Sequence, residues 1–332
     1  MMLKRRQAET RVHRAPGLLS FVGCALSCLL STGAALAEYP ERPIRFIVPF
    51  GPGGATDIVA RSVAQKLTEA WGQPVVIDNR GGAGGTIGTE LVAKAAPDGY
   101  TLLLATTSNA ANVAMGARLP FDLQKDFAPV TQLIHAPFVL TMSPKVPAAT
   151  LRELLALAKT KPGALNYGTV GGFNELMMEQ LKSMAGADIL RVPYKGVGPA
   201  LVDLMAGRVN MMLFSVGVAL PYLKDGRLRA MGVTTTRRVA QLPDVPAITE
   251  SLPGYDMAAW YGVLAPAQTP RPIVAILSAE LARMMQSAEI RDSYGRQGFI
   301  PVGSTPPAFG RAIADDIAKF RRIVKDAGIQ PE

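Results

Sequence analysis

The fold is decided by the stretch Ile44-Arg45-Phe46-Ile47-Val48-Pro49-Phe50-Gly51-Pro52-Gly53-Gly54-Ala55-Thr56-Asp57. Its apolar start favours a short β-strand, which ends at Pro49 because proline has no N–H for a sheet ladder. The glycines that follow predict a sharp turn with uncovered N–H groups, and apolar residues at helical spacing predict a helix behind it. Such a junction directs unpaired N–H groups and the positive end of a helix dipole at one point, so it can hold an anion. A tight turn without a ligand has the same pattern.

A second junction of the same kind lies in the other half of the chain. Residues 165–168 favour a short strand, Thr169-Val170-Gly171-Gly172-Phe173-Asn174 a glycine turn, and residues 175–184 a helix. The methionines of this helix are typical of core packing. Two junctions of one design favour a binding site over two unrelated turns.

The first 37 residues have the pattern of a cleavable signal peptide. A basic leader is followed by an apolar run from 17 to 30 and by Ala35-Leu36-Ala37, a cleavage pattern before Glu38. We therefore expect cleavage after Ala37 and release into the periplasm. No later apolar run has the length needed to span a membrane.

Composition excludes several classes of protein. Both cysteines lie in the leader, so the mature chain has no disulfide and no thiolate site. The leader holds five of the 35 Lys and Arg residues and one of the 26 Asp and Glu residues, which lowers the net charge from +9 to +5. The remaining charge is scattered, so we expect solvated surface and no nucleic-acid binding. The remaining 295 of the 332 residues suffice for two domains.

Strands alternate with helices along the mature chain, which predicts an α/β protein with mostly parallel sheets. Thr150-Leu151-Arg152-Glu153 is a capping-box pattern that opens a helix, and Pro137 predicts a bend in an apolar run. Further strands are expected at 75–77, 101–105, 189–192, 209–214, 228–234 and 260–264, and further helices at 197–206, 270–285 and 305–325. In such sheets ligands bind beyond the carboxyl ends of the strands.

Seven short motifs occur together in one order. They are Phe50-Gly51-Pro52-Gly53-Gly54-Ala55-Thr56-Asp57, Asn79-Arg80-Gly81-Gly82-Ala83-Gly84-Gly85, Pro97-Asp98-Gly99-Tyr100, Pro193-Tyr194-Lys195-Gly196, Leu242-Pro243-Asp244-Val245-Pro246, Trp260-Tyr261-Gly262 and Ala265-Pro266. With them the chain resembles the periplasmic substrate-binding proteins of tripartite tricarboxylate transporters, the Bordetella uptake gene (Bug) family, over essentially all of residues 38–332.

The resemblance implies a two-lobed periplasmic-binding-protein fold of the Venus-flytrap, type II-like kind. Each lobe would be a mostly parallel sheet flanked by helices. Lobe one would comprise residues 38–138 and 258–332, and lobe two residues 139–257. Hinge strands are expected near 137–140 and 260–264.

The resemblance further implies an extracytoplasmic solute receptor without catalysis. It would bind a small carboxylate in the cleft and deliver it to a membrane permease of the tripartite tricarboxylate type. We expect a monomer with transient permease contact, no cofactor and no metal. A sensor without a transport role stays an alternative, because the residues do not disclose the partner.

The site residues that the resemblance implies come from both lobes. Lobe one would contribute Phe50, Pro52, Gly53, Gly54, Asp57, Gly84, Gly85, Thr107 and Ser108. Lobe two would contribute Thr169, Val170, Gly171, Gly172, Phe173, Asn174, Lys195, Gly196 and Ser215. On closure, the turns at 53–57 and 169–174 would direct N–H groups at one ligand carboxylate.

Several of these residues can have a structural role instead of, or in addition to, a role in ligand binding. Asp57 can stabilise the dipole of its helix whether or not ligand is bound. Phe50 and Phe173 are as well suited to core packing as to a pocket wall, and Lys195 to solvent. Glu175 takes the place of a histidine that many family members have, and it would disfavour a second ligand carboxylate unless Lys195 or a water intervenes.

A secreted α/β hydrolase is the rival class. The glycine run 82–88 has its third glycine one place too late for a dinucleotide fingerprint, no Walker lysine follows either loop, and no serine lies in a nucleophile elbow. His135 is the one histidine outside the leader, and its apolar surroundings favour a structural role, so a catalytic triad or zinc site is not expected. Composition leaves a carboxylate-pair hydrolase open, but no motif points to one.

Overall fold

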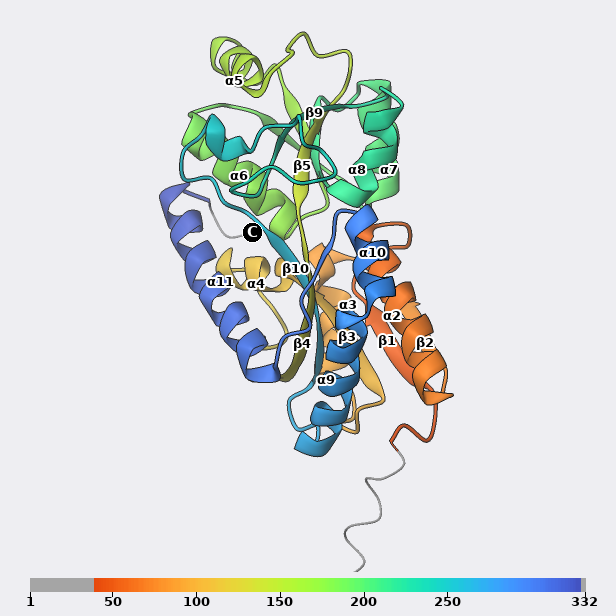
Figure 1. Ribbon diagram of the computed structural model, residues 1–332. Coiled ribbons are helices and arrows are strands. Elements are labelled where there is room, and N and C mark those ends of the chain that lie inside the picture. Colours follow the sequence, from red (N-terminus) through yellow and green to blue (C-terminus); the bar gives the residue numbers. More distant parts are fainter. Residues whose placement is uncertain (1–38, 330–332) are drawn as a thin grey trace, which may run out of the picture. The chain divides into compact units, whose positions relative to one another are not determined.

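The computed structural model describes residues 39–329, and residues 40–329 form two β-sheets flanked by helices (Figure 1). The predicted signal peptide and its cleavage site lie outside the described residues. Among the described residues, no helix combines the length and apolar character that crossing a bilayer requires.

The first sheet has six strands in the order β11-β4-β10-β3-β1-β2. They are β1 (Ile44–Val48), β2 (Val75–Asn79), β3 (Thr101–Thr106), β4 (Phe127–Ala136), β10 (Ala259–Pro266) and β11 (Ile300–Pro301). The decisive stretch folds as expected, because β1 leads through a glycine turn into α2 (Ala55–Trp71). Strand β1 pairs in parallel with β2 and β3, and its apolar residues are buried between the helices on either face.

The second sheet has five strands in the order β7-β6-β8-β5-β9. They are β5 (Phe138–Met142), β6 (Asn166–Thr169), β7 (Leu190–Pro193), β8 (Met211–Ser215) and β9 (Arg229–Val233). Strand β6 pairs in parallel with β7 and β8, whereas β5 runs antiparallel to β8 and β9. The α/β class is thus confirmed, but pairing within each sheet is more evenly mixed than the mostly parallel arrangement expected. Strands β4, β5 and β10 cause this mixture. They lie next to the places where the chain passes from one sheet to the other, and they pair antiparallel with neighbouring strands.

The chain passes from one sheet to the other at two places. Pro137 separates β4 from β5 and supplies the predicted bend; its carbonyl accepts a hydrogen bond from Val216 N–H at 2.9 Å. The return passage runs beside it, because Thr234 N–H donates to the Phe138 carbonyl and Met257 N–H to the Thr234 carbonyl. Strand β10 follows this passage and pairs along its length with β3 and β4, so residues 260–264 lie inside the first sheet. The lobe boundaries and the hinge stay predictions.

Helices cover both sheets. Those of the first sheet include α2, α3 (Thr86–Ala93), α4 (Thr107–Ala114), α9 (Arg271–Gln286), α10 (Ala288–Arg296) and α11 (Pro306–Asp326). Those of the second are α5 (Leu151–Thr160), α6 (Phe173–Ala185), α7 (Val197–Ala206) and α8 (Val216–Lys224); short 3₁₀ turns occur at Ala83–Gly85 and Ile248–Glu250. Helix α11 buries Phe309, Ile313, Ile317 and Phe320 on the face that its spacing predicts. Phe320 also stacks at 5.4 Å on Phe173 of α6.

Candidate functional site

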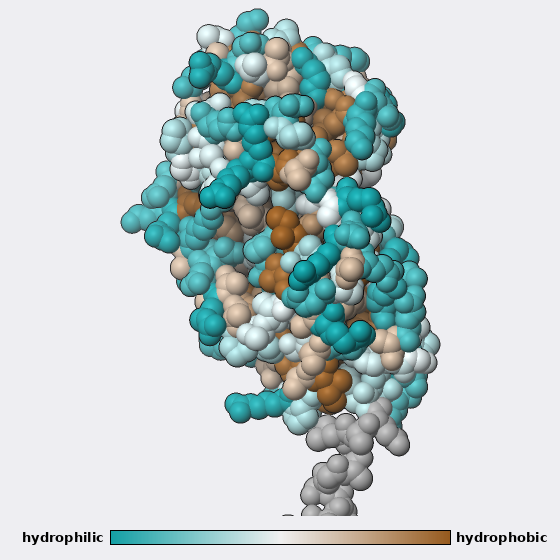
Figure 2. Space-filling model, viewed as in Figure 1, coloured by the Kyte–Doolittle hydropathy of each residue, from teal (hydrophilic) through white to brown (hydrophobic). Residues whose placement is uncertain are grey.

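A cavity of about 1140 Å³ lies at the carboxyl ends of strands from both sheets. Its first side, which we call wall one, consists of residues 50–52, 54–56, 81–86 and 106–108, at and after the carboxyl ends of β1, β2 and β3. Its second side, wall two, consists of residues 170–175, 191, 193–199 and 213–215. Figure 2 shows one group of hydrophobic residues in the middle of the visible face, between α11 and α10, and others above and below it.

Wall one is built mainly from backbone. Gly54 is the N-cap of α2 in an extended conformation with φ −87°, and no side chain caps that helix. Asn79 at the end of β2 donates to the Phe50 carbonyl at 3.0 Å and so fixes the loop after β1. Thr106 opens α4 with a capping box, since its Oγ1 accepts from Ser108 N–H and its own N–H donates to Asn109. Residues 107–109 thus form the first turn of α4.

Asp57 lies behind wall one. Its carboxylate accepts hydrogen bonds from Gly53 N–H at 3.2 Å, from Arg61 at 2.9 Å and from Asn79 at 3.1 Å. Burial alone would raise the pKa of Asp57, but these hydrogen bonds and the Arg61 charge outweigh it and hold the pKa below its usual value. Asp57 therefore organises the glycine turn from behind.

Wall two carries more side-chain polarity than wall one. Asn174 in the first turn of α6 donates from Nδ2 to the Leu213 carbonyl of β8 at 2.7 Å. Ser215, the N-cap of α8, gives its helix no side-chain cap. Tyr194 donates to Asp203 at 2.8 Å, and burial followed by this hydrogen bond raises its pKa to about 12, so it stays neutral at physiological pH.

Within residues 39–329, six helices begin at this cavity. Each of their N-cap residues lines it: Gly54 for α2, Gly85 for α3, Thr106 for α4, Gly172 for α6, Gly196 for α7 and Ser215 for α8. Every helix N-terminus carries about half a positive charge on N–H groups that lack intrahelical partners. The cavity therefore has a positive potential that originates from the backbone.

The charged side chains at the cavity add to this potential. Glu175 is the single carboxylate among the described lining residues, and it pairs with Arg191 at 2.9 Å. Lys195 and Arg118 also line the cavity, are exposed, and form no ion pair with a described residue. The neutralising partner of Glu175 is thus Arg191, where the sequence had suggested Lys195 or a water.

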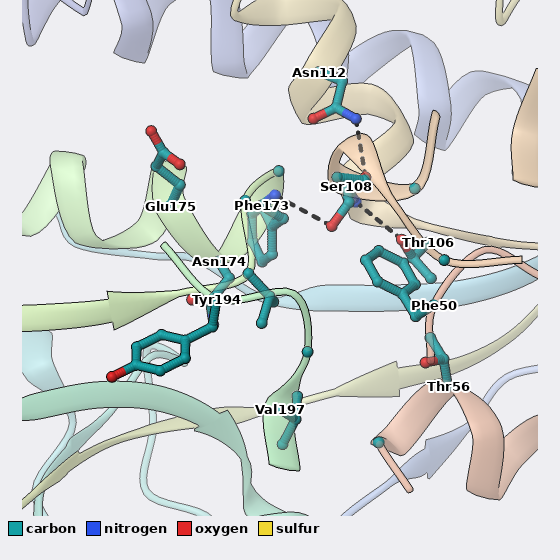
Figure 3. Close-up of a pocket in the computed structure, with 18 of the residues that line it drawn as sticks. Phe50, Thr56, Thr106, Ser108, Asn112, Phe173, Asn174, Glu175, Tyr194 and Val197 are labelled. Carbon is teal, nitrogen blue, oxygen red and sulfur yellow. Dashed lines mark hydrogen bonds between the residues drawn. The ribbon is translucent and has the colours of Figure 1, made fainter. Parts of the chain in front are cut away.

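The two walls touch beside the cavity. Phe173 N–H donates to Ser108 Oγ at 3.2 Å, and Figure 3 shows this bond joining residues of opposite walls. A Cβ added to Gly172 would lie 2.7 Å from Ser108 Cβ, and one added to Gly171 would lie 3.6 Å from Gly84 Cα. Glycine is required here both for space and for the positive φ of +58° at Gly172.

All but three of the expected site residues line the cavity. The exposed Gly53 and the buried Asp57 do not line it, and Thr169 is fully buried at the end of β6, where its hydroxyl accepts from Gly171 N–H. Phe173 serves in both roles considered, since it is 2% exposed, packs on Phe320 and lines the cavity.

Other lining residues were missed by the sequence analysis; they include Thr56, Thr106, Asn112, Arg118, Arg191, Tyr194 and Val197. The capping-box pattern of residues 106–109 could have revealed Thr106. Arg191 lies on a strand and carries no local signal. Among the described residues, no group of three or more His, Cys, Asp or Glu side chains is suited to hold a metal ion.

Comparison with known proteins agrees with this architecture. The family model described as "Tripartite tricarboxylate transporter family receptor" matches residues 59–329. The chain belongs to this family. It is 35% identical over 317 residues to the Bordetella pertussis protein BugT, an alignment that covers 94% of this chain and 97% of BugT.

Solved structures of similar proteins share the two-lobed fold. The Rhodopseudomonas palustris protein Rpa4515, determined with adipate, has a TM-score of 0.86 and 35% identity over 89% of this chain and 100% of its own. MatC from the same species, determined with malate, has a TM-score of 0.82 and 33% identity over 86% of this chain and 100% of its own. The family and the periplasmic-binding-protein fold that the motifs predicted are confirmed.

Proposed function

We propose that this protein is an extracytoplasmic solute receptor that binds a small carboxylate in the cavity between walls one and two. The observation that carries the proposal is the convergence of six helix N-termini on one cavity. Among the described lining residues Glu175 is the single carboxylate, and it is paired with Arg191. Unpaired N–H groups and helix dipoles stabilise an anion without any cationic side chain.

Two relatives support the chemical class of the ligand. Rpa4515 was determined with adipate and MatC with malate, both dicarboxylates. The cavity of about 1140 Å³ has room for a ligand of that size and for its hydration water.

The receptor role extends to a membrane partner. Ligand capture would draw the lobes, with the expected boundaries 38–138 plus 258–332 and 139–257, together about the passages near Pro137 and Met257. The closed form would be presented in the periplasm to a permease of the tripartite tricarboxylate type, the receptor itself acting as a monomer without catalysis. The family membership and the paired passages support this proposal.

A thermal-shift screen tests the proposal. Residues 38–332, refolded to remove co-purified ligand, are screened against aliphatic and aromatic carboxylates and against the neutral amides of the same acids. A ligand that binds only the native state raises Tm by mass action, so a subset of the acids should raise it while their amides do not. Equal shifts with acids and amides, or no shift from any acid, would contradict carboxylate binding.

A further inference from the structure

Two glycines bring parts of the two sheets into backbone contact. Gly217 lies in the first turn of α8, directly after β8 of the second sheet, and Gly298 lies between α10 and β11 of the first sheet. A Cβ added to Gly217 would collide with the carbonyl oxygen of Gln297, and one added to Gly298 would lie 2.8 Å from Val216 Cγ1. The start of α8 and the loop after α10 therefore meet without room for a side chain on either glycine.

Backbone conformation does not explain the glycine at position 217. Gly298 has a φ of +77°, which L-residues rarely adopt, whereas the φ of Gly217 is not positive. Alanine is the better helix former, so α8 by itself would favour alanine at this position. Gly217 does not line the cavity either, although Ser215 and Val218 do. What requires glycine at position 217 is thus the close approach of Gln297.

The contact lies between one passage of the chain and the cavity. Val216 N–H donates to the Pro137 carbonyl at 2.9 Å, so the residue before Gly217 is bound to the passage that follows β4. On the other side of the contact, the Phe299 ring lies 6.5 Å from the ring of Tyr261, which lines the cavity. A rotation of one sheet against the other about this passage therefore moves α8 against the loop after α10.

A second contact between the same two parts of the molecule uses a side chain. Gln241, in the segment after β9, donates from Nε2 to the carbonyl of Gly295 near the end of α10. Gln241 does not line the cavity. The two contacts differ in kind, because a glutamine side chain can rotate to follow a moving partner, whereas backbone packed on backbone cannot yield.

We propose that the Gly217–Gln297 contact is the stop that sets the angle at which the two lobes close; this inference rests on the closure in the proposed function. Where the two backbones meet, the lobes can approach no further, and Phe173 N–H of wall two is then within reach of Ser108 of wall one. Gly217 is thereby a positioning residue, which acts on the ligand through the separation of the walls. A methyl group at position 217 would halt the lobes earlier, so that both walls could not contact the ligand together.

Gly217→Ala tests this inference, because it adds one methyl group at the contact. Calorimetry with the tightest-binding acid of the thermal screen should show roughly 10- to 100-fold lower affinity, since the closed form that binds the acid becomes less populated by that factor. The loss should come mainly from faster dissociation. The Tm of the ligand-free protein should stay unchanged or rise, because α8 gains a better helix former.

The distance between two labels gives a readout that a purely structural role would not move. Residues 38–332 contain no cysteine, so Ala70→Cys in α2 and Ala156→Cys in α5, both exposed, place one label beside each sheet. With saturating acid, the otherwise unaltered protein should shift from its ligand-free distance to a closed distance. The same protein with Gly217→Ala should stop between the two.

Two further variants separate the stop from other effects. Gly295→Ala is the matched control, since Gly295 is also a helical glycine near the contact, but a Cβ there meets no atom within 4 Å. It should leave the affinity and the closed distance as they are. Gln241→Ala removes a hydrogen bond without adding volume, so it should weaken binding only about two- to tenfold and leave the closed distance unchanged.

A Gly217→Ala protein that reaches the same closed distance as the unaltered protein would overturn the inference, whatever its affinity. A lower Tm of ligand-free Gly217→Ala with unchanged affinity would overturn it too, because the contact would then be permanent packing. Binding of the acid by the unaltered protein without a change in label distance would remove the stop but leave carboxylate binding intact. Absence of binding by every acid in the thermal screen would instead contradict the proposed function.

Discussion

Apart from Phe50, wall one presents backbone and small side chains to the cavity, whereas wall two contains a buried unpaired amide oxygen, a buried unpaired hydroxyl and an ion pair. Both walls follow the carboxyl ends of strands and both begin helices there. At wall one, helix α2 begins without a side-chain cap, so its first N–H groups are available to any anion. Wall two contains Asn174, Ser215 and the Glu175–Arg191 pair. How favourably these groups interact with a ligand depends on the hydrogen-bonding groups and the charge of that ligand.

The difference suggests a division of labour between the walls. A backbone anion site depends on turn geometry, so its residues act through shape and tolerate little added volume. A side-chain site depends on hydrogen-bond complementarity, so its residues decide which carboxylate is preferred. The following predictions probe that division, in order of decreasing effect on affinity.

Gly54→Val should reduce carboxylate affinity at least about 100-fold by covering charge-assisted N–H donors of α2. Valine is compatible with the backbone, since Gly54 has φ −87° and ψ 173°. A Cβ there lies 3.9 Å from Val197, so the larger side chain fills the gap between the walls.

Calorimetry and a melting curve check this result, with Gly295→Val in α10 as the control because an added Cβ there meets no atom within 4 Å and the residue lies outside the cavity. Unchanged affinity of Gly54→Val would mean that wall one does not hold the anion.

Gly172→Ala should lower affinity about ten- to hundredfold and destabilise the fold by roughly 1–3 kcal/mol, because an L-residue is strained at this positive φ. The added Cβ also collides with Ser108 at 2.7 Å. Removing that collision in the double variant Gly172→Ala with Ser108→Gly should recover part of the affinity. Additive losses in the double-mutant cycle would show that the contact between the walls is not coupled to binding.

Arg191→Met should weaken carboxylate binding on the order of tenfold at low salt, because it removes a positive charge that offsets the Glu175 carboxylate beside the anion. Glu175→Gln should have the opposite sign and strengthen binding. Added salt should diminish both effects. Affinities measured at two ionic strengths check the pair, and a loss of affinity in both variants would indicate a purely structural role for the ion pair.

Asp57→Asn should change affinity within about threefold but lower the free energy of unfolding by about 1–3 kcal/mol at neutral pH. Because the pKa of Asp57 is depressed in the folded state, its contribution is present above the unfolded pKa, near 4, and is lost as pH falls through the folded value. The difference in Tm from the unaltered protein should therefore be constant between pH 6 and 8 and shrink below pH 4. A large loss of affinity without loss of stability would instead make Asp57 a ligand residue.

The sequence predicted the elements that depend on local chemistry. The strand–turn–helix junction at residues 44–67 and the capping box that opens α5 both follow from residues close in sequence, and both are present. The motifs that the chain shares with the family also predicted the fold and many of the residues that line the cavity.

The parts of the structure that the sequence did not predict depend on contacts between elements. Arg191 pairs with Glu175 across the neighbouring strands β6 and β7, and Asp57 accepts a hydrogen bond from Asn79 at the end of β2. Likewise, no local pattern tells that Asn174 gives its Nδ2 to Leu213 and leaves Oδ1 unpaired.

A crystal structure of residues 38–332 with the tightest-binding acid of the thermal screen tests the central claim most directly. The account predicts a carboxylate that accepts N–H hydrogen bonds where α2 and α6 begin, with the rest of the ligand against Asn174 and Ser215. A carboxylate bound instead by the side chains of Arg191 or Lys195, with the helix N-termini left to water, would contradict it.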